Sequence, residues 1–123
     1  NINSNNKQIN QMENVLSDLF SEMFPNEEIV DLRNQIENKL NDLSVSNQSK
    51  LSRALDITNE IALKANILEI NYTDESILFK CNFKNDSEES IFINQLKRMN
   101  INLNIDNREN NQIGVVTKFV YEL

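Results

Sequence analysis

The fold of this chain is decided by one stretch of alternating side chains, LEINYTDESILFKCNF at residues 68–83. Apolar residues alternate with polar ones in two runs, and the polar residues at 73–75 between the runs favour a turn. The inward positions are Leu68, Ile70 and Tyr72 in the first run, and Ile77, Phe79, Cys81 and Phe83 in the second. A period of two is typical of a strand with one buried face, so the stretch predicts an antiparallel hairpin.

Helical patterns lie on both sides of this hairpin. Before it, the apolar spacing at residues 50–65 predicts a helix, with Ser49 as its cap. After it, Asp86-Ser87-Glu88-Glu89 is a capping-box pattern, which predicts the start of a helix that continues to Met99. Two further strands are expected at residues 101–105 and 113–121, with a loop at 106–112 between them.

From Lys50 onward the predicted order is therefore αββ-αββ. Two such units form a four-stranded antiparallel sheet with both helices on one face, which is an α+β fold. The layout is ferredoxin-like, circularly permuted so that the usual first strand comes last. In it the 113–121 strand is central, between the 101–105 and 77–83 strands, and the 67–72 strand lies at an edge.

Two more helices are expected ahead of this domain, at 7–24 and 27–43, because Pro25 disfavours helix at the residue before it. Asn26 is the expected cap of the second helix. A polar connector at 44–49 then divides the chain into a helical extension (residues 1–46) and a ferredoxin-like domain (residues 47–123). Two arrangements fit the apolar stripe of the first helix: a coiled-coil stem leading from a membrane span, or a helix packed back on the domain.

The composition argues against several function classes. The net charge is −7 and the 12 basic residues are scattered apart from Lys97-Arg98, whereas a nucleic-acid site needs clustered Lys and Arg. The chain has no His, the commonest general base and metal ligand, and its single cysteine, Cys81, cannot form an internal disulfide. We therefore expect no catalytic residues, no metal site, no cofactor and no nucleic-acid partner. Cys81 is expected to be a small buried hydrophobe.

Paired acidic residues at 27–28, 74–75 and 88–89 lie at expected helix starts or turns, where solvated carboxylates are normal. The only glycine, Gly114, lies inside an expected strand and indicates a bulge or a close backbone approach. No apolar run reaches the roughly 18 residues of a membrane span. Because the chain begins with Asn rather than Met, we expect it to be a fragment of a longer protein.

The segment after the first expected helix carries a more specific pattern. It contains Phe24-Pro25, Ile29-Val30 and then RNQIENKL at residues 33–40, with Arg33, Gln35, Glu37 and Leu40 at defined spacing. A generic amphipathic helix would give the apolar spacing, but not the Phe-Pro pair and the Arg-x-Gln-x-Glu order together. The segment resembles the region just after the membrane span in the L protein of bacterial type II secretion systems (general secretion pathway protein L). The resemblance is specific at 24–40 and architectural from residue 50 onward.

The resemblance implies the periplasmic domain of a bitopic inner-membrane protein, whose cytoplasmic actin-like part is absent from this chain. In the family, the cytoplasmic part holds the secretion ATPase, and the periplasmic domain associates with itself and with the M protein. The implied function is a non-enzymatic assembly-platform scaffold that couples the ATPase to pseudopilus assembly. The implied partners are a second copy of the chain, the M protein and, only through the absent part, the ATPase.

The expected contact surface combines the edge strand with the outer face of the 50–65 helix. An edge strand that carries a single central charge, Glu69, is open to pairing with a partner strand. The candidate interface residues are Leu68, Ile70, Tyr72, Arg53, Asp56, Asn59 and Glu60. Leu32 and Ile36 are expected to dock within the chain. Two alternatives remain: a type IV pilus N- or O-like alignment protein, and a helical adaptor unrelated to secretion.

Overall fold

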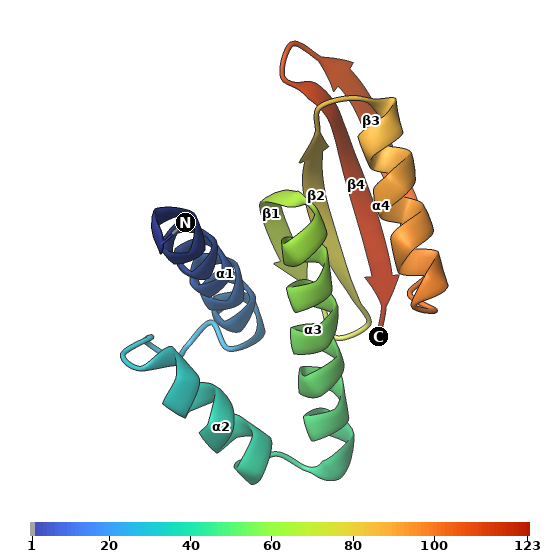
Figure 1. Ribbon diagram of the computed structural model, residues 1–123. Helices are drawn as coiled ribbons and strands as arrows, with labels where there is room; N and C mark the ends of the chain where they lie inside the picture. Colours follow the sequence, from blue (N-terminus) through green and yellow to red (C-terminus); the bar gives the residue numbers. More distant parts are fainter. Residues whose placement is uncertain (1) are drawn as a thin grey trace.

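The computed structural model describes the backbone of residues 2–123 and the side chains of residues 12–123. These residues form an α+β fold with four helices and one four-stranded antiparallel sheet (Figure 1). The helices are α1 (Ile2–Met23), α2 (Leu32–Asp42), α3 (Val45–Lys64) and α4 (Asp86–Arg98). The strands are β1 (Asn66–Tyr72), β2 (Ser76–Phe83), β3 (Asn104–Asn111) and β4 (Gly114–Glu122). The strand order β1-β2-β4-β3 is the one expected from the sequence.

β1 and β2 form the expected hairpin, but β1 contains a bulge. Ile67 pairs with Cys81 and Ile70 with Phe79, and Leu68 falls at the register shift between them. A bulge inserts one extra residue, so the alternation predicted from Leu68 onward is wrong at this residue. Leu68 is 46% exposed. The alternation in β2 is confirmed, since its inward residues are buried and its outward residues are half-buried.

β4 lies between β2 and β3, and its inward side chains Val115, Thr117 and Phe119 are buried. Ile113, which was expected on this inward face, is instead 62% exposed in the turn before β4. Gly114 makes the close backbone approach that its position indicates. Its φ is 116°, and an added Cβ would lie 2.2 Å from the carbonyl oxygen of Phe83, so only glycine fits here.

The strand expected at 101–105 and the loop expected at 106–112 are wrong. β3 runs from Asn104 to Asn111, it pairs with β4, and all of its residues are exposed. Because no face of β3 is buried, it has no apolar alternation to reveal it, and main-chain hydrogen bonds to β4 define it instead. The connection between the two strands shortens to residues 112–113.

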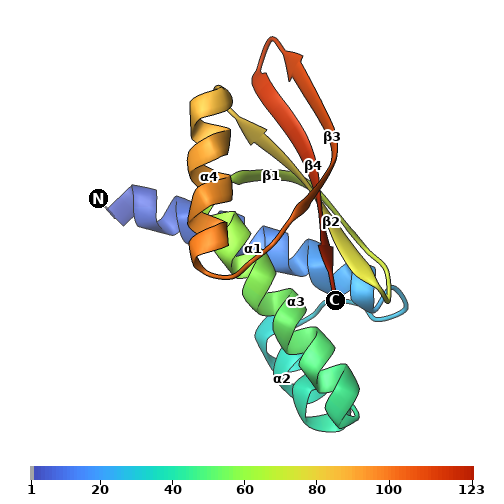
Figure 2. The ribbon, with the colours of Figure 1, turned by 90° about the vertical axis from the view of Figure 1, so that its right-hand side faces the viewer.

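The core lies between the sheet and the helices and is built around three phenylalanines. The ring centroids of Phe83 and Phe92 are 5.1 Å apart, and those of Phe92 and Phe119 are 5.4 Å apart. Such tilted pairs at about 5 Å are favourable aromatic contacts. Ala54 and Ile61 of α3 belong to the same cluster, and α3 and α4 lie on the same side of the sheet (Figure 2).

α1 packs back on the rest of the chain along residues 12–23. In both ribbon views it lies beside β1 and α3 (Figures 1 and 2). Leu19 and Phe20 are buried, and Leu19 belongs to the apolar cluster that α3 and the sheet share. The helix begins at Ile2 rather than near residue 7. The side chains of residues 7–11 lie outside the described residues, and the stem arrangement of that part stays a prediction.

The helix expected at 27–43 is wrong at its start. α2 begins at Leu32, and its N-cap is Asp31, whose side chain accepts a hydrogen bond from a backbone N–H three residues further on. Asn26 is therefore not the cap. Residues 24–31 form an irregular turn between α1 and α2.

The flexible connector expected at 44–49 is also wrong, because these residues cap and begin α3. The Ser44 hydroxyl accepts a hydrogen bond from the backbone of Asn47, and the helix starts at Val45, so Ser49 is inside it. A serine N-cap is a favourable helix start even when polar residues follow. The domain division at residues 46–47 stays a prediction, and α3 spans it.

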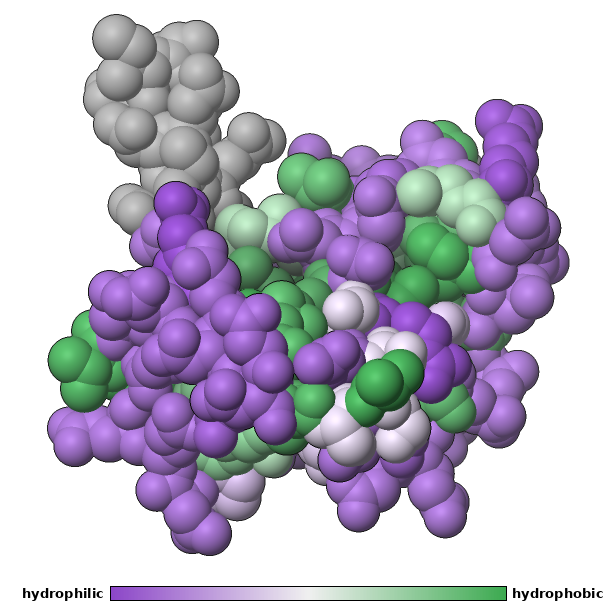
Figure 3. All heavy atoms as spheres, turned by 90° about the horizontal axis from the view of Figure 1, so that it is seen from below, coloured by the Kyte–Doolittle hydropathy of each residue, from purple (hydrophilic) through white to green (hydrophobic). Residues whose placement is uncertain are grey.

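The face of the molecule seen from below is mainly hydrophilic (Figure 3). Polar side chains cover most of this face, and apolar side chains appear near its centre and in several separate spots (Figure 3). This surface fits a chain with 39% hydrophobic residues and a net charge of −7, in which most large apolar side chains are needed for the core.

Candidate functional site

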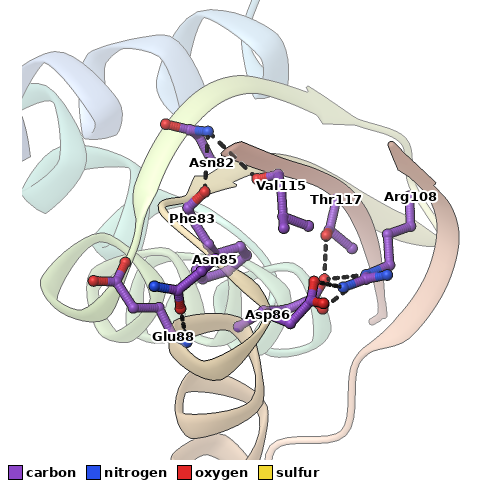
Figure 4. Close-up of polar contacts among 9 residues, drawn as sticks. Asn82, Phe83, Asn85, Asp86, Glu88, Arg108, Val115 and Thr117 are labelled. Atoms are coloured by element: carbon purple, nitrogen blue, oxygen red, sulfur yellow. Dashed lines mark hydrogen bonds and ion pairs between the residues drawn. The ribbon is translucent and has the colours of Figure 1, made fainter. Parts of the chain in front are cut away.

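The densest polar cluster of the described residues joins α4 to the β3–β4 hairpin. The Glu89 carboxylate accepts two hydrogen bonds from Arg108 Nε, at 2.8 Å to Oε1 and 3.0 Å to Oε2. The Thr117 hydroxyl donates to the same carboxylate, and Arg108 Nη2 donates to Asp86. Figure 4 shows these side chains converging from three elements. Glu89 and Thr117 are buried, while the Arg108 side chain is 35% exposed.

Local structure places each member of this cluster. Asn85 is the N-cap of α4, and its side-chain oxygen accepts from the N–H of Glu88 at 3.0 Å. The capping box expected at Asp86–Glu89 is therefore shifted by one residue, and Glu88 returns a hydrogen bond to the N–H of Lys84 at 3.1 Å. This cap starts the helix so that the residue after Glu88 points at the sheet. Arg108 and Thr117 are cross-strand partners in β3 and β4.

The electrostatics of the cluster favour its charged form. The hydrogen bond to Glu89 raises the pKa of Arg108 above its ordinary value, and Asp86 adds to the shift. Both carboxylates lie in the first turn of α4, where the helix dipole favours negative charge. Because the Glu89 oxygens accept from Arg108 and from Thr117, the cluster is well suited to anchoring α4 on the hairpin.

The solvated acidic pair expected at 88–89 is thus wrong for Glu89, which is 5% exposed. A signal for this was present in the sequence. Glu89 stands three residues before Phe92 and seven before Leu96, which is the spacing of one buried helical stripe. Its partner Arg108 had no comparable signal, because it lies in a strand without apolar residues at alternate positions.

A groove of about 870 Å³ opens elsewhere, between α1, the end of α3 and α4, and no member of this cluster is among its described lining residues. Its walls include Val15, Leu63 and Ile91, and its floor includes Phe83 and Phe92. Leu63 and Ile91 are 68% and 56% exposed. Polar side chains of the same elements border the groove, so it is a mixed surface rather than an apolar pocket.

The sequence-predicted interface residues are only partly brought together. On α3, Arg53, Asp56 and Asn59 are exposed, and Glu60 is half-buried in an ion pair with Lys64 at 2.8 Å. On β1, Leu68 is exposed and Tyr72 is half-buried, but Ile70 is 7% exposed and belongs to the core. The side chain of Ile70 therefore has little surface to offer a partner.

The segment that resembles the L protein forms a compact elbow between α1 and α2. Gln35 Oε1 accepts from the backbone N–H groups of Val30 and Asp31 at 2.8 and 2.9 Å. Its Nε2 donates to the Glu28 carbonyl at 2.8 Å and to the Glu27 side chain at 3.3 Å. The Gln35 side chain therefore forms hydrogen bonds with both ends of the turn, at residues 27–28 and 30–31. We call this arrangement the Gln35 clasp.

A second layer of contacts reinforces the Gln35 clasp. The Lys39 ammonium lies 2.7 Å from Glu27 and 4.7 Å from the ring centroid of Phe24, which is a cation–π distance. The hydrogen bond from Lys39 lowers the pKa of Glu27 below 4.5. Phe24 also contacts Phe20 of α1, with ring centroids 5.0 Å apart, so the elbow is tied to the end of α1.

The remaining members of that segment lie outside this network. Arg33 and Glu37 are exposed, and among the residues that the structure describes no ion pair joins them. Pro25 and Val30 are exposed, whereas Ile29 and Leu40 are half-buried. Leu32 and Ile36 are also half-buried, and α2 contacts α3. The pattern thus separates into residues that build the elbow and residues that face solvent.

Cys81 is 0% exposed, as expected, and burial raises the pKa of its thiol to about 12. At neutral pH the thiol is therefore protonated and a poor nucleophile. Within the described residues, no helix has the length and apolar character needed to cross a membrane.

Comparison of the chain with protein families, with curated proteins and with solved structures finds no match.

Proposed function

We propose that this chain is a non-enzymatic scaffold, the periplasmic part of a type II secretion L protein. In this role it binds a second copy of itself and the M protein, and it couples the cytoplasmic ATPase to pseudopilus assembly. The proposed location is the periplasmic side of the inner membrane of a bacterium. We also propose that the sheet with α3 and α4 is a circularly permuted ferredoxin-like domain.

The observation that carries the proposal is the strand order β1-β2-β4-β3 together with the placement of α3 and α4 on one face of the sheet. Counting β4 as the first strand gives the succession βαββαβ, which is that of a ferredoxin-like domain. A short connection at residues 112–113 and a turn at 73–75 make the β3–β4 and β1–β2 pairs local, while the β2–β4 pair joins the two hairpins. This arrangement supports the architectural part of the resemblance to the L protein.

The Gln35 clasp gives the sequence part of the resemblance a physical basis. Phe24 and Gln35 belong to the shared pattern, and both have defined contacts in the elbow. Lys39 supplies the basic position of that pattern and pairs with Glu27. A pattern whose members cooperate in one local structure is favoured as a unit over a chance string.

The surface that fits partner contacts best is the outer face of α3. Arg53, Asp56 and Asn59 recur at helical spacing on this face, and all three are exposed. A polar surface of this kind fits a transient, exchangeable contact rather than a permanent one. The edge of β1 is flanked by α1 (Figure 1), so α3 is the more accessible part of the expected contact surface.

The test is an NMR titration of the isotope-labelled chain with the periplasmic domain of the M-like protein encoded beside it. We expect shifts clustered on residues 50–72. The absence of shifts at about 1 mM partner contradicts the proposal. At that concentration, only complexes with a binding free energy weaker than about −4 kcal/mol escape detection.

A charge-reversed variant tests whether the exposed face of α3 carries the contact. Asp56→Lys should weaken binding about tenfold, because it changes the centre of the exposed α3 face. Asp42→Lys, at the exposed end of α2, is the matched control and should bind as the unmodified chain does. Binding that is lost equally in both variants points to net charge rather than to α3.

A further inference from the structure

The elbow and α2 lie at one end of the molecule, away from the main core. In both ribbon views α2 and the first half of α3 project past the end of the sheet that carries the β1–β2 turn and the C-terminus (Figures 1 and 2). Phe20 of α1 and Leu51 of α3 are 2% and 1% exposed, yet neither belongs to the buried cluster that the sheet shares with the helices. This end of the molecule therefore has a small apolar centre of its own.

α2 is attached to this end of the molecule by light packing. None of its residues is fully buried, and its apolar stripe of Leu32, Ile36 and Leu40 is half-buried. Its main contacts with another helix or strand are those with α3. Helices shorter than about 12–15 residues are marginal in water without tertiary packing, and α2 has 11 residues. The helical structure of α2 and its contacts with α3 should therefore form and be lost together.

Polar contacts near the surface hold α2 at its start. The Gln35 clasp joins α2 to the elbow, and Lys39 pairs with Glu27, with side chains that are 30% and 32% exposed. Ion pairs with this much exposure contribute little to stability. At the other end, only Leu43 and Ser44, both extended, separate α2 from α3. Few buried contacts and exposed hydrogen bonds are the features of a region that opens locally.

We propose that residues 24–43 form a strap, which releases as one unit while the sheet stays folded. In the closed state Phe24 stacks on Phe20, and α2 lies against the first half of α3 (Figures 1 and 2). Release removes both contacts and uncovers Phe20 and Leu51. The strap is thus a conformational switch that determines whether this apolar centre reaches solvent, and the clasp made by Gln35 is its latch. The proposal does not depend on the scaffold function.

Native-state hydrogen exchange of the whole chain, followed by NMR in low concentrations of urea, tests the strap. The backbone amides of residues 35–43 should exchange as a set, with one common opening free energy, and at least about 100-fold faster than the amides of β2 and β4. Gln35→Ala should speed the exchange of this set about tenfold, because it removes the hydrogen bonds of the clasp, and should leave the sheet unchanged. Gln95→Ala, at an exposed position of α4, is the matched control and should change neither.

A thiol placed under the strap reports the same opening chemically. In Leu51→Cys, a thiol reagent should label residue 51 at least about tenfold faster than Cys81, which is buried in the main core. Exchange of residues 35–43 together with the sheet amides would overturn the proposal, and so would exchange that proceeds residue by residue from one end of α2. Equal labelling rates at the two thiols, or exchange that Gln35→Ala leaves unchanged, would also overturn it.

Discussion

Replacing Glu89 with alanine should lower the free energy of unfolding by about 3 kcal/mol. The Thr117 hydroxyl is 0% exposed, and losing its acceptor leaves a buried polar group unsatisfied, at a cost of about 1–3 kcal/mol. The buried Cγ methylene of Glu89, which alanine lacks, adds about 0.8 kcal/mol. Arg108 adds little, because its side chain is 35% exposed and its guanidinium can turn to water. Against a total stability of roughly 6–18 kcal/mol for a chain of this length, the loss is substantial.

Urea denaturation followed by circular dichroism at neutral pH measures this loss. Glu88→Ala is the control, because it removes an exposed carboxylate from the same turn of α4 and shares the dipole contribution of about 0.5 kcal/mol. It also loses the capping hydrogen bond from the Lys84 N–H, so it should itself cost about 1 kcal/mol. Adding Thr117→Val to Glu89→Ala removes the orphaned hydroxyl and should restore about 1 kcal/mol. The reasoning is refuted if Glu89→Ala costs no more than Glu88→Ala, or if the double variant is as unstable as the single one.

Three further outcomes follow from features described above. Gly114→Ala should cost about 3 kcal/mol in a denaturation series, since the new Cβ would meet the Phe83 carbonyl; a neutral result would contradict the close approach. The Cys81 thiol, with its pKa raised to about 12, should resist thiol reagents in the native chain and react in urea, so rapid native labelling would contradict its burial. The Glu27 carboxyl should titrate below 4.5 by NMR, and its contribution to stability should be complete above that pH and be lost as the pH falls through the lower folded value. In Lys39→Gln the midpoint should move back up, and an unchanged midpoint would contradict the assigned cause.

The buried strands were predictable because their side chains alternate. β2 and β4 each bury one face against the core, so buried residues such as Phe79, Cys81 and Phe119 recur at every second position. With short hairpins between neighbours, the strand order then follows from connectivity. β3 was misplaced since its sequence NIDNRENN has no buried face, and its strand state depends on pairing with β4.

Helix starts were less predictable because side chains other than the expected caps satisfy the backbone. The turn at 24–31 is held by Gln35, which lies inside the following helix and gives no signal as a turn residue. Ser44 caps α3 ahead of a polar first turn that is typical of a loop. In the polar cluster, the helical spacing of Glu89 with Phe92 was readable, whereas its pairing with Arg108 required the register of β3.

The position of β4 has a consequence for how the chain folds during synthesis. β4 is made after the other three strands of the sheet, and it pairs with both β2 and β3. Until residues 114–122 leave the ribosome, β3 has no strand partner, and β2 is paired on one side only. The nascent chain therefore holds an incomplete sheet until β4 has emerged, a period in which unpaired strand edges are open to aggregation. A chain that lacks β4 would lose the centre of its sheet rather than its margin.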